Sequence, residues 1–165
     1  MEELAQGEIS VERGVDGDHK GSKFRRRAVT ILAREDWEAA LLDVAASGAD
    51  VSDLDWTARR ANLLVEGVRL PRAIGATLRI GPVLLEVTYP TTPCARMDEA
   101  REGLRKALHP EWRGGVTCLV LEGGRVDVGD ADVLAVAARF VSDDKMAFAV
   151  AAHLKNAPSG GVQRP

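Results

Sequence analysis

The residue of this chain best suited to chemistry is Cys94, in the segment TYPTTPCARM. Pro90 and Pro93 place it in a loop after a predicted strand, and Arg96 follows two residues later. A cysteine acts as a nucleophile, metal ligand or persulfide carrier in its thiolate form, which a neighbouring guanidinium favours. We expect the loop to leave Cys94 accessible, and the local sequence leaves two interpretations open, of which a functional thiol is one. The alternative is a small apolar loop residue, because free cysteines are often buried and inert.

Cys118 has a different setting, inside the apolar run VTCLVL. This run predicts a core strand, where burial raises the pKa of a thiol and removes access to it. We expect Cys118 to be structural, and we expect no disulfide between it and Cys94. His19, His109 and His153 show no zinc-ligand spacing with either cysteine.

A basic segment, residues 19–27 (HKGSKFRRR), holds five of the 22 lysines and arginines and no acidic residue. Glycines within and before it allow backbone N–H groups to approach an anion, although the Gly-Lys-Ser/Thr ending of a P-loop is absent. We predict phosphate contacts from Lys20, Arg26 and Arg27. The alternative is a solvated loop before a strand, as most runs of charge are surface.

Arg59, Arg60 and Asn62 stand just before another predicted strand. Arginines at the mouth of a strand suit bidentate recognition of phosphate or carboxylate, and Asn62 either orients a ligand amide or closes a turn. We expect Arg59 and Arg60 to face the same concavity as residues 14–27, so that two distant segments form one anion site.

Short β-branched or leucine-rich runs separated by glycines predict the elements that carry these residues. Strands are predicted at 28–32, 62–65, 77–80, 83–88, 117–122, 125–128 and 133–137. Apolar spacing predicts helices at 34–48 and 98–108, and Gly123-Gly124 predicts a hairpin between two of the strands. The expected fold class is mainly β, a mostly antiparallel β-barrel with a few short covering helices.

The composition of the chain predicts its domain organisation and argues against several classes of function. The chain has 165 residues, 45% of them apolar, and a net charge of −3, which predicts a single domain over residues 1–141. An extension follows at 142–165, with a short helix at 145–154 and a frayed tail. The acidic balance and 4% aromatic content argue against nucleic-acid binding and base-stacking platforms. We expect no membrane span and no signal peptide, and hence a cytoplasmic protein.

Taken in order, several segments resemble the MOSC family, named for the C-terminal domain of molybdenum cofactor sulfurase. The resemblance covers about residues 14–135 and is carried by order and spacing, with Pro-Cys after a Leu-Glu-Val-Thr strand the most telling piece. The matching segments are residues 14–19, 27–32, 59–67, 80–88, 93–94 and 113–115, followed by Gly123, Val128, Gly129 and Asp130.

The resemblance implies a β-barrel in which Cys94 carries a sulfane sulfur or ligates molybdenum. It also implies a pocket for an anionic molybdenum-pterin cofactor. The implied lining is Asp18, His19, Arg59, Arg60 and Asn62, to which the residue patterns add Lys20, Arg26, Arg27 and Arg96.

The implied function is therefore cofactor binding, sulfur carriage, or both, with the enzymatic activity left open. The chain has no pyridoxal-phosphate domain such as precedes this module in the fused sulfurases. Pyridoxal phosphate is accordingly not expected to bind this chain, and a cysteine-desulfurase-type sulfur donor or a molybdoenzyme acceptor is the expected partner. A rival hypothesis is a non-catalytic anion- or nucleotide-binding barrel in which Cys94 is incidental. A third, nucleic-acid binding through residues 20–27, is disfavoured by the charge balance.

Overall fold

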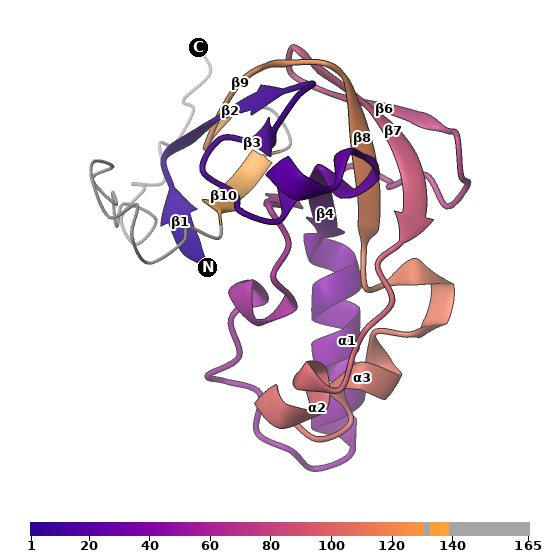
Figure 1. Ribbon diagram of the computed structural model, residues 1–165. Coiled ribbons are helices and arrows are strands. Elements are labelled where there is room, and N and C mark those ends of the chain that lie inside the picture. Colours follow the sequence, from indigo (N-terminus) through magenta and orange to yellow (C-terminus); the bar gives the residue numbers. More distant parts are fainter. Residues whose placement is uncertain (131–132, 139–165) are drawn as a thin grey trace, which may run out of the picture.

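The computed structural model describes residues 1–130 and 133–138, and its main feature is a curled seven-stranded sheet (Figure 1). Its strand order is β1–β10–β5–β4–β8–β7–β6. All neighbouring pairs are antiparallel except β4 with β5, which are parallel. The strands are β1 (Glu2–Leu4), β10 (Val133–Ala138), β5 (Leu63–Val65), β4 (Val29–Ala33), β8 (Val116–Glu122), β7 (Val83–Pro90) and β6 (Thr77–Ile80).

A second sheet of three strands packs against the first and has the order β3–β2–β9. These strands are β3 (Gly14–Val15), β2 (Gln6–Ser10) and β9 (Gly124–Asp127). Only short breaks at Ala5 and Gly123 separate β2 from β1 and β9 from β8, so the chain turns from one sheet into the other at two corners. The predicted fold class, mainly β and mostly antiparallel with few helices, is confirmed.

The hairpin predicted at Gly123-Gly124 is wrong, because β9 pairs with β2 and not with β8. The two glycines mark a corner at which the backbone passes close to other segments. A Cβ on Gly123 would lie 2.5 Å from the carbonyl oxygen of Ile9, and one on Gly124 would lie 2.7 Å from Cγ of Pro82. Glycine is needed here for close approach and not for a two-residue turn.

The helices lie on one side of the curled sheet (Figure 1). Helix α1 (Arg34–Ala46) connects the parallel strands β4 and β5 and confirms the helix predicted at 34–48. The single helix predicted at 98–108 is two short ones, α2 (Arg96–Ala100) and α3 (Leu104–Ala107). They are separated because Arg101 is extended and Gly103 has a φ of 87°. Four 3₁₀ turns complete the structure: η1 (Gly21–Lys23), η2 (Arg25–Arg27), η3 (Trp56–Arg59) and η4 (Pro110–Trp112).

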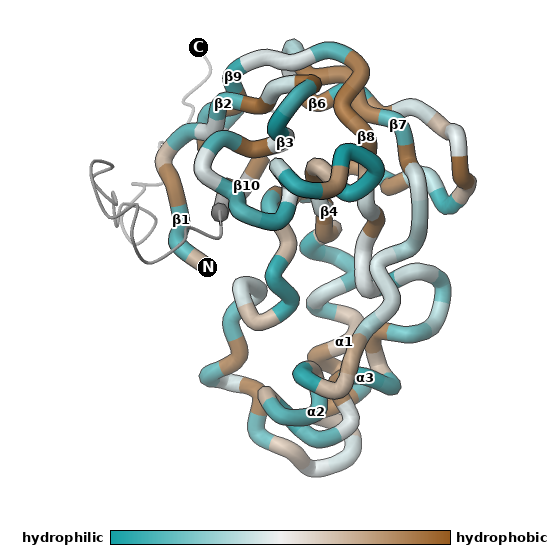
Figure 2. Tube along the Cα trace, in the orientation of Figure 1, coloured by the Kyte–Doolittle hydropathy of each residue, from teal (hydrophilic) through white to brown (hydrophobic). Residues whose placement is uncertain are grey.

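Strands β4 and β5 are buried on both faces and separate two hydrophobic cores. Alternate residues point to opposite sides of a strand, so Ile31 and Leu63 enter the barrel core while Leu32 and Leu64 face the helices. Figure 2 shows hydrophobic residues along much of β8, which lies beside β4. Thr30 shares the helix-facing side of β4 with Leu32, and this side leads to the candidate site.

Three sequence predictions lie outside the described residues. They are the helix at 145–154, the extension at 142–165 and the domain boundary between 141 and 142. Within residues 1–130 and 133–138, no helix is both long and apolar enough to cross a lipid bilayer.

Candidate functional site

A pocket of ≈ 430 Å³ opens where the basic segment, strand β4, turn η3 and the loop after β7 meet. The loop after β7 carries Cys94 and leads into α2. Three stretches that are far apart in the sequence, residues 20–30, 59–60 and 91–97, therefore meet at this pocket. The lining residues are Lys20, Phe24, Arg27, Thr30, Arg59, Arg60, Thr91, Thr92, Cys94, Arg96 and Met97.

The electrostatic character of the pocket is one-sided. Five lining residues are lysine or arginine and none is acidic, although the whole chain has a net charge of −3. Among the described residues, no carboxylate forms an ion pair with Lys20, Arg27, Arg59 or Arg96. Clustered cations repel one another unless an anion lies among them, so the pocket is suited to an anionic ligand.

Cys94 lies in the loop between β7 and α2, and its side chain is exposed. The loop is fixed at both ends by backbone hydrogen bonds, from Thr91 N to the Gly115 carbonyl (2.8 Å) and from Met97 N to the Cys94 carbonyl (2.9 Å). The predicted accessibility of Cys94 is confirmed. Its thiol is thereby presented at a pocket whose other charged lining residues are all cationic.

Arg59 is the buried member of the cationic set, with 6% of its surface exposed. Its guanidinium donates from Nε to the Gly114 carbonyl (2.9 Å) and from Nη2 to the Thr91 carbonyl (2.5 Å). Burial lowers its pKa to about 10, the neighbouring Cys94 opposes this shift, and Arg27 adds to it. Arg59 therefore stays protonated at neutral pH and ties the Cys94 loop to the start of β8.

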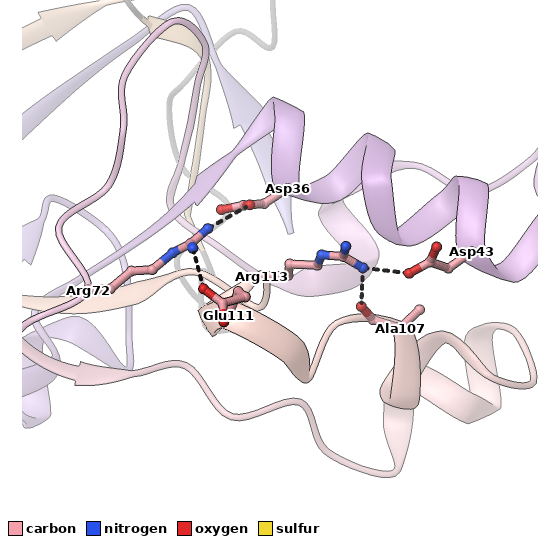
Figure 3. Close-up of polar contacts among 6 residues, drawn as sticks. All are labelled: Asp36, Asp43, Arg72, Ala107, Glu111 and Arg113. Atoms are coloured by element: carbon pink, nitrogen blue, oxygen red, sulfur yellow. Dashed lines mark hydrogen bonds and ion pairs between the residues drawn. The ribbon is translucent and has the colours of Figure 1, made fainter.

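Gly114, one of the two residues whose carbonyls accept from Arg59, follows a segment that ion pairs connect to α1 (Figure 3). Arg113 contacts Asp43 on α1 (2.5 Å) and the Ala107 carbonyl (3.3 Å). Arg72 bridges Asp36 (3.4 Å) and Glu111 (2.8 Å). Such partly exposed ion pairs add little stability individually, about 0–1 kcal/mol. Their consequence is positional, since they hold the segment before Gly114 near Arg59.

Arg60 follows η3 in a left-handed conformation, with a φ of 62°. Its N–H donates to the Thr57 carbonyl, which closes the turn. A non-glycine residue in this region carries about 1–3 kcal/mol of strain, and such strain clusters at functional sites. Here the conformation lets two consecutive arginines line one pocket, as the sequence predicts for Arg59 and Arg60.

The structure divides the predicted basic segment. Lys20 and Arg27 line the pocket. Arg26, next in sequence to Arg27, lies over the Tyr89 ring, with its guanidinium carbon 5.4 Å from the ring centroid, and it does not line the pocket. His19 is exposed and also lies outside the lining.

Asp18 and Asn62 are buried and stabilise the scaffold around the pocket. Asp18 Oδ2 accepts from Gly21 N (2.9 Å) at the base of the basic segment. Asn62 Oδ1 accepts from both N (2.9 Å) and Oγ1 (2.8 Å) of Thr30, and Thr30 does line the pocket. The predicted site residues therefore separate into Lys20, Arg27, Arg59, Arg60, Cys94 and Arg96 around the pocket and Asp18, His19, Arg26 and Asn62 away from its lining.

Sequence reasoning missed five lining residues. Four of them, Thr30, Thr91, Thr92 and Met97, flank predicted site residues in space but have side chains that carry no charge or reactive group. The fifth, Phe24, stands within the basic segment. Its position among lysines and arginines could have indicated a site residue. The low aromatic content of the chain, 4%, instead led us to expect no stacking platform.

We predict that an alkylating reagent labels Cys94 in the native protein while Cys118 stays unmodified until the protein unfolds. Cys118 is buried in the barrel core, and burial raises its pKa to about 12, so it presents neither access nor thiolate. Peptide mapping after a short exposure to iodoacetamide measures both sites. Labelling of Cys118 before Cys94 would contradict the structural assignment.

Comparison with known proteins identifies the class. The family model described as the MOSC domain matches residues 16–131, and the chain belongs to the MOSC domain family. This family is associated with ligands related to the molybdenum cofactor. No curated protein matches the sequence.

Solved structures share the fold at low sequence identity. YiiM from Escherichia coli superposes with a TM-score of 0.58 and 21% identity, covering 80% of this chain and 62% of that one. The YuaD protein from Bacillus subtilis gives 0.56 and 17%, covering 75% and 81%. A protein described as hypothetical gives 0.61 and 20%, covering 82% and 62%. The chain thus spans 62% of the length of two of these structures.

Proposed function

We propose that the pocket binds a molybdenum-pterin cofactor or a closely related anionic ligand, and that Cys94 presents its sulfur to that ligand. The observation that carries the proposal is the coincidence of an exposed cysteine with five cationic lining residues and no acidic one. Membership of the MOSC domain family supports it.

The residues present fit such a group. A phosphate arm matches arginine and lysine donors, and a thiolate is a soft ligand of the kind that soft metal centres prefer. The described residues contain no cluster of three or more His, Cys, Asp or Glu side chains that could hold a metal ion. When bound, the cofactor would supply a molybdenum centre that accepts thiolate sulfur.

The side chains have separable roles in this proposal. The exposed cations Lys20, Arg27 and Arg96 bind the anionic part of the ligand. Arg59 is a positioning residue, since its donors hold the carbonyls of Thr91 and Gly114. Cys94 carries a sulfane sulfur or ligates molybdenum.

Sulfur carriage by Cys94 requires a source and a destination for the sulfur. As the source we propose a cysteine-desulfurase-type donor with its own pyridoxal phosphate; the Cys94 thiolate would take the outer sulfur of the donor's persulfide, whose S–S bond breaks to leave the donor thiolate. As the destination we propose a molybdoenzyme acceptor. Both cysteines of the chain are free, as expected in a reducing compartment such as the cytoplasm. The exposed position of Cys94 supports transfer between proteins, because a persulfide must be reached by its partner.

A second candidate function is anion or nucleotide binding in which Cys94 is incidental. It is favoured by the same five cations, which suit any phosphate and need no thiol. The two candidates differ in the ligand that the pocket retains and in whether Cys94 takes part.

The experiment that separates them is analysis of protein purified from cells that make the molybdenum cofactor. Elemental analysis measures molybdenum, pterin fluorescence measures the cofactor ring, and cyanide-releasable sulfur measures a persulfide. We expect the wild-type chain to retain pterin with molybdenum or sulfane sulfur. Cys94→Ser should lose the molybdenum or sulfane sulfur, while Cys118→Ala, the matched control, keeps it. Equal retention in all three proteins would make Cys94 incidental.

A further inference from the structure

Phe24 is an apolar ring in a cationic pocket. It is 60% exposed and lines the pocket together with Lys20 and Arg27. Trp37 and Trp56, in contrast, are only 5% and 6% exposed. A phenyl ring left in water forgoes the hydrophobic stabilisation that burial gives, and a ligand bound in the pocket could cover the Phe24 ring because the ring is part of the lining.

The backbone around Phe24 is tied to the barrel on both sides. Before it, Asp18 holds Gly21 N, and Gly21 lies so close to the Ala28 carbonyl that a Cβ would be 2.5 Å from its oxygen. After it, Arg27 N donates to the Phe24 carbonyl (2.7 Å), and the hydroxyl of Thr88 donates to the Arg26 carbonyl. Phe24 therefore lies between η1 and η2 in a segment whose backbone is held by hydrogen bonds on both sides.

An exposed ring beside cations complements a ligand that has a flat ring and an anionic arm. Aromatic side chains stack on planar heterocycles, and the neighbouring cations contact the phosphate. The acidic balance of the chain argues against a nucleic-acid strand, and one ring offers a platform for one heterocycle.

We propose that Phe24 is the ring platform of this pocket and selects heteroaromatic phosphates over simple phosphates. The inference rests on the proposed function, since a phosphate-bearing pterin is one such ligand, and it adds the residue that reads the ring. A nucleotide has the same chemistry, so pterin and nucleotide probes are compared.

The test is calorimetric titration of the full chain with three probes: a 6-hydroxymethylpterin phosphate, guanosine monophosphate and inorganic pyrophosphate. Phe24→Ala and Phe24→Leu remove the ring, the second while keeping an apolar side chain, and Phe24→Tyr keeps the ring. Stacking on a single ring corresponds to a loss of roughly five- to 150-fold in affinity on truncation. In Phe24→Ala and Phe24→Leu we expect this loss for each ring-bearing probe that the wild-type chain binds. Phe24→Tyr should keep the wild-type affinity. Pyrophosphate binding should be unchanged in all three variants.

The outcomes are distinguishable. Loss confined to the pterin or to the nucleotide supports the platform and identifies the ring it reads. Unchanged heteroaromatic binding in Phe24→Ala and Phe24→Leu overturns the platform and leaves the anion site intact. Equal losses for pyrophosphate and the ring-bearing probes also overturn it, because Phe24 would then act through the anion site. Failure of the wild-type chain to bind any probe overturns the proposed function and this inference with it.

Discussion

Replacing Arg27 with alanine should weaken binding of a phosphate-bearing ligand by roughly ten- to hundredfold. Arg27 lines the pocket, and a charge-assisted hydrogen bond to phosphate is worth about 1.5–3 kcal/mol. The side chain is exposed, so its removal should change the free energy of unfolding by no more than about 0.5 kcal/mol. Titration with pyrophosphate at low salt measures the binding loss, since salt screens exposed charges.

Arg26 supplies the matched control because it has the same side chain one position earlier. Its guanidinium lies over Tyr89 and not in the pocket lining. Arg26→Ala should therefore keep the wild-type affinity for pyrophosphate while losing a cation–π contact worth about 0.5–1 kcal/mol at an exposed site. If both variants kept the wild-type affinity for pyrophosphate, the basic segment would be only a solvated loop.

Gly115→Ala should destabilise the fold by about 2–5 kcal/mol, the sum of overpacking, about 1–3 kcal/mol, and the cost of the left-handed conformation, about 1–2 kcal/mol. Gly115 has a φ of 91°, and a Cβ there would lie 2.1 Å from the carbonyl oxygen of Ile31. The clash is with the backbone of β4, so no side-chain rotation relieves it. The Gly115 carbonyl also accepts from Thr91 N, which couples the variant to the Cys94 loop.

Gly48→Ala separates the two contributions. Gly48 has a φ of 93°, nearly that of Gly115, and a Cβ there would meet no atom within 4 Å. This variant should lose only the cost of the left-handed conformation, about 1–2 kcal/mol. Urea unfolding of both variants measures the difference. If both variants lost the same free energy of unfolding, the assignment of a close contact between Gly115 and β4 would be contradicted.

Much of the fold could be predicted because its signals are local. The helix that becomes α1 follows from apolar spacing, and β4 follows from its apolar run. The hairpin at Gly123-Gly124 could not be judged locally, because the partner of β9 is β2, more than a hundred residues away. Strands β1 and β2 were missed because they are short and have few apolar residues, and β1 is also mostly exposed.

Site residues could be predicted where a charge or a thiol marks them in the sequence. They could be predicted less well where the fold decides whether a side chain points into the pocket. Cys94, Arg59 and Lys20 meet around one pocket because η3, the basic segment and the β7–α2 loop converge. The sequence marks Asp18 and Asn62 as site residues equally well, because their side chains are polar. In the structure, Asp18 accepts from Gly21 N and Asn62 accepts from Thr30 N, and neither residue lines the pocket. Arg26 and Arg27 diverge because adjacent residues of a 3₁₀ turn point in different directions.

The most direct test of the account asks whether an anion and Cys94 share one site. Iodoacetamide labelling of Cys94 is followed with and without saturating pyrophosphate or a pterin phosphate. We predict that the anion slows labelling of Cys94 in the wild-type chain and in Arg26→Ala, and that the protection is lost in Arg27→Ala at the same anion concentration. Labelling of Cys94 at the same rate whether or not the bound anion is present would contradict a single pocket for ligand and thiol.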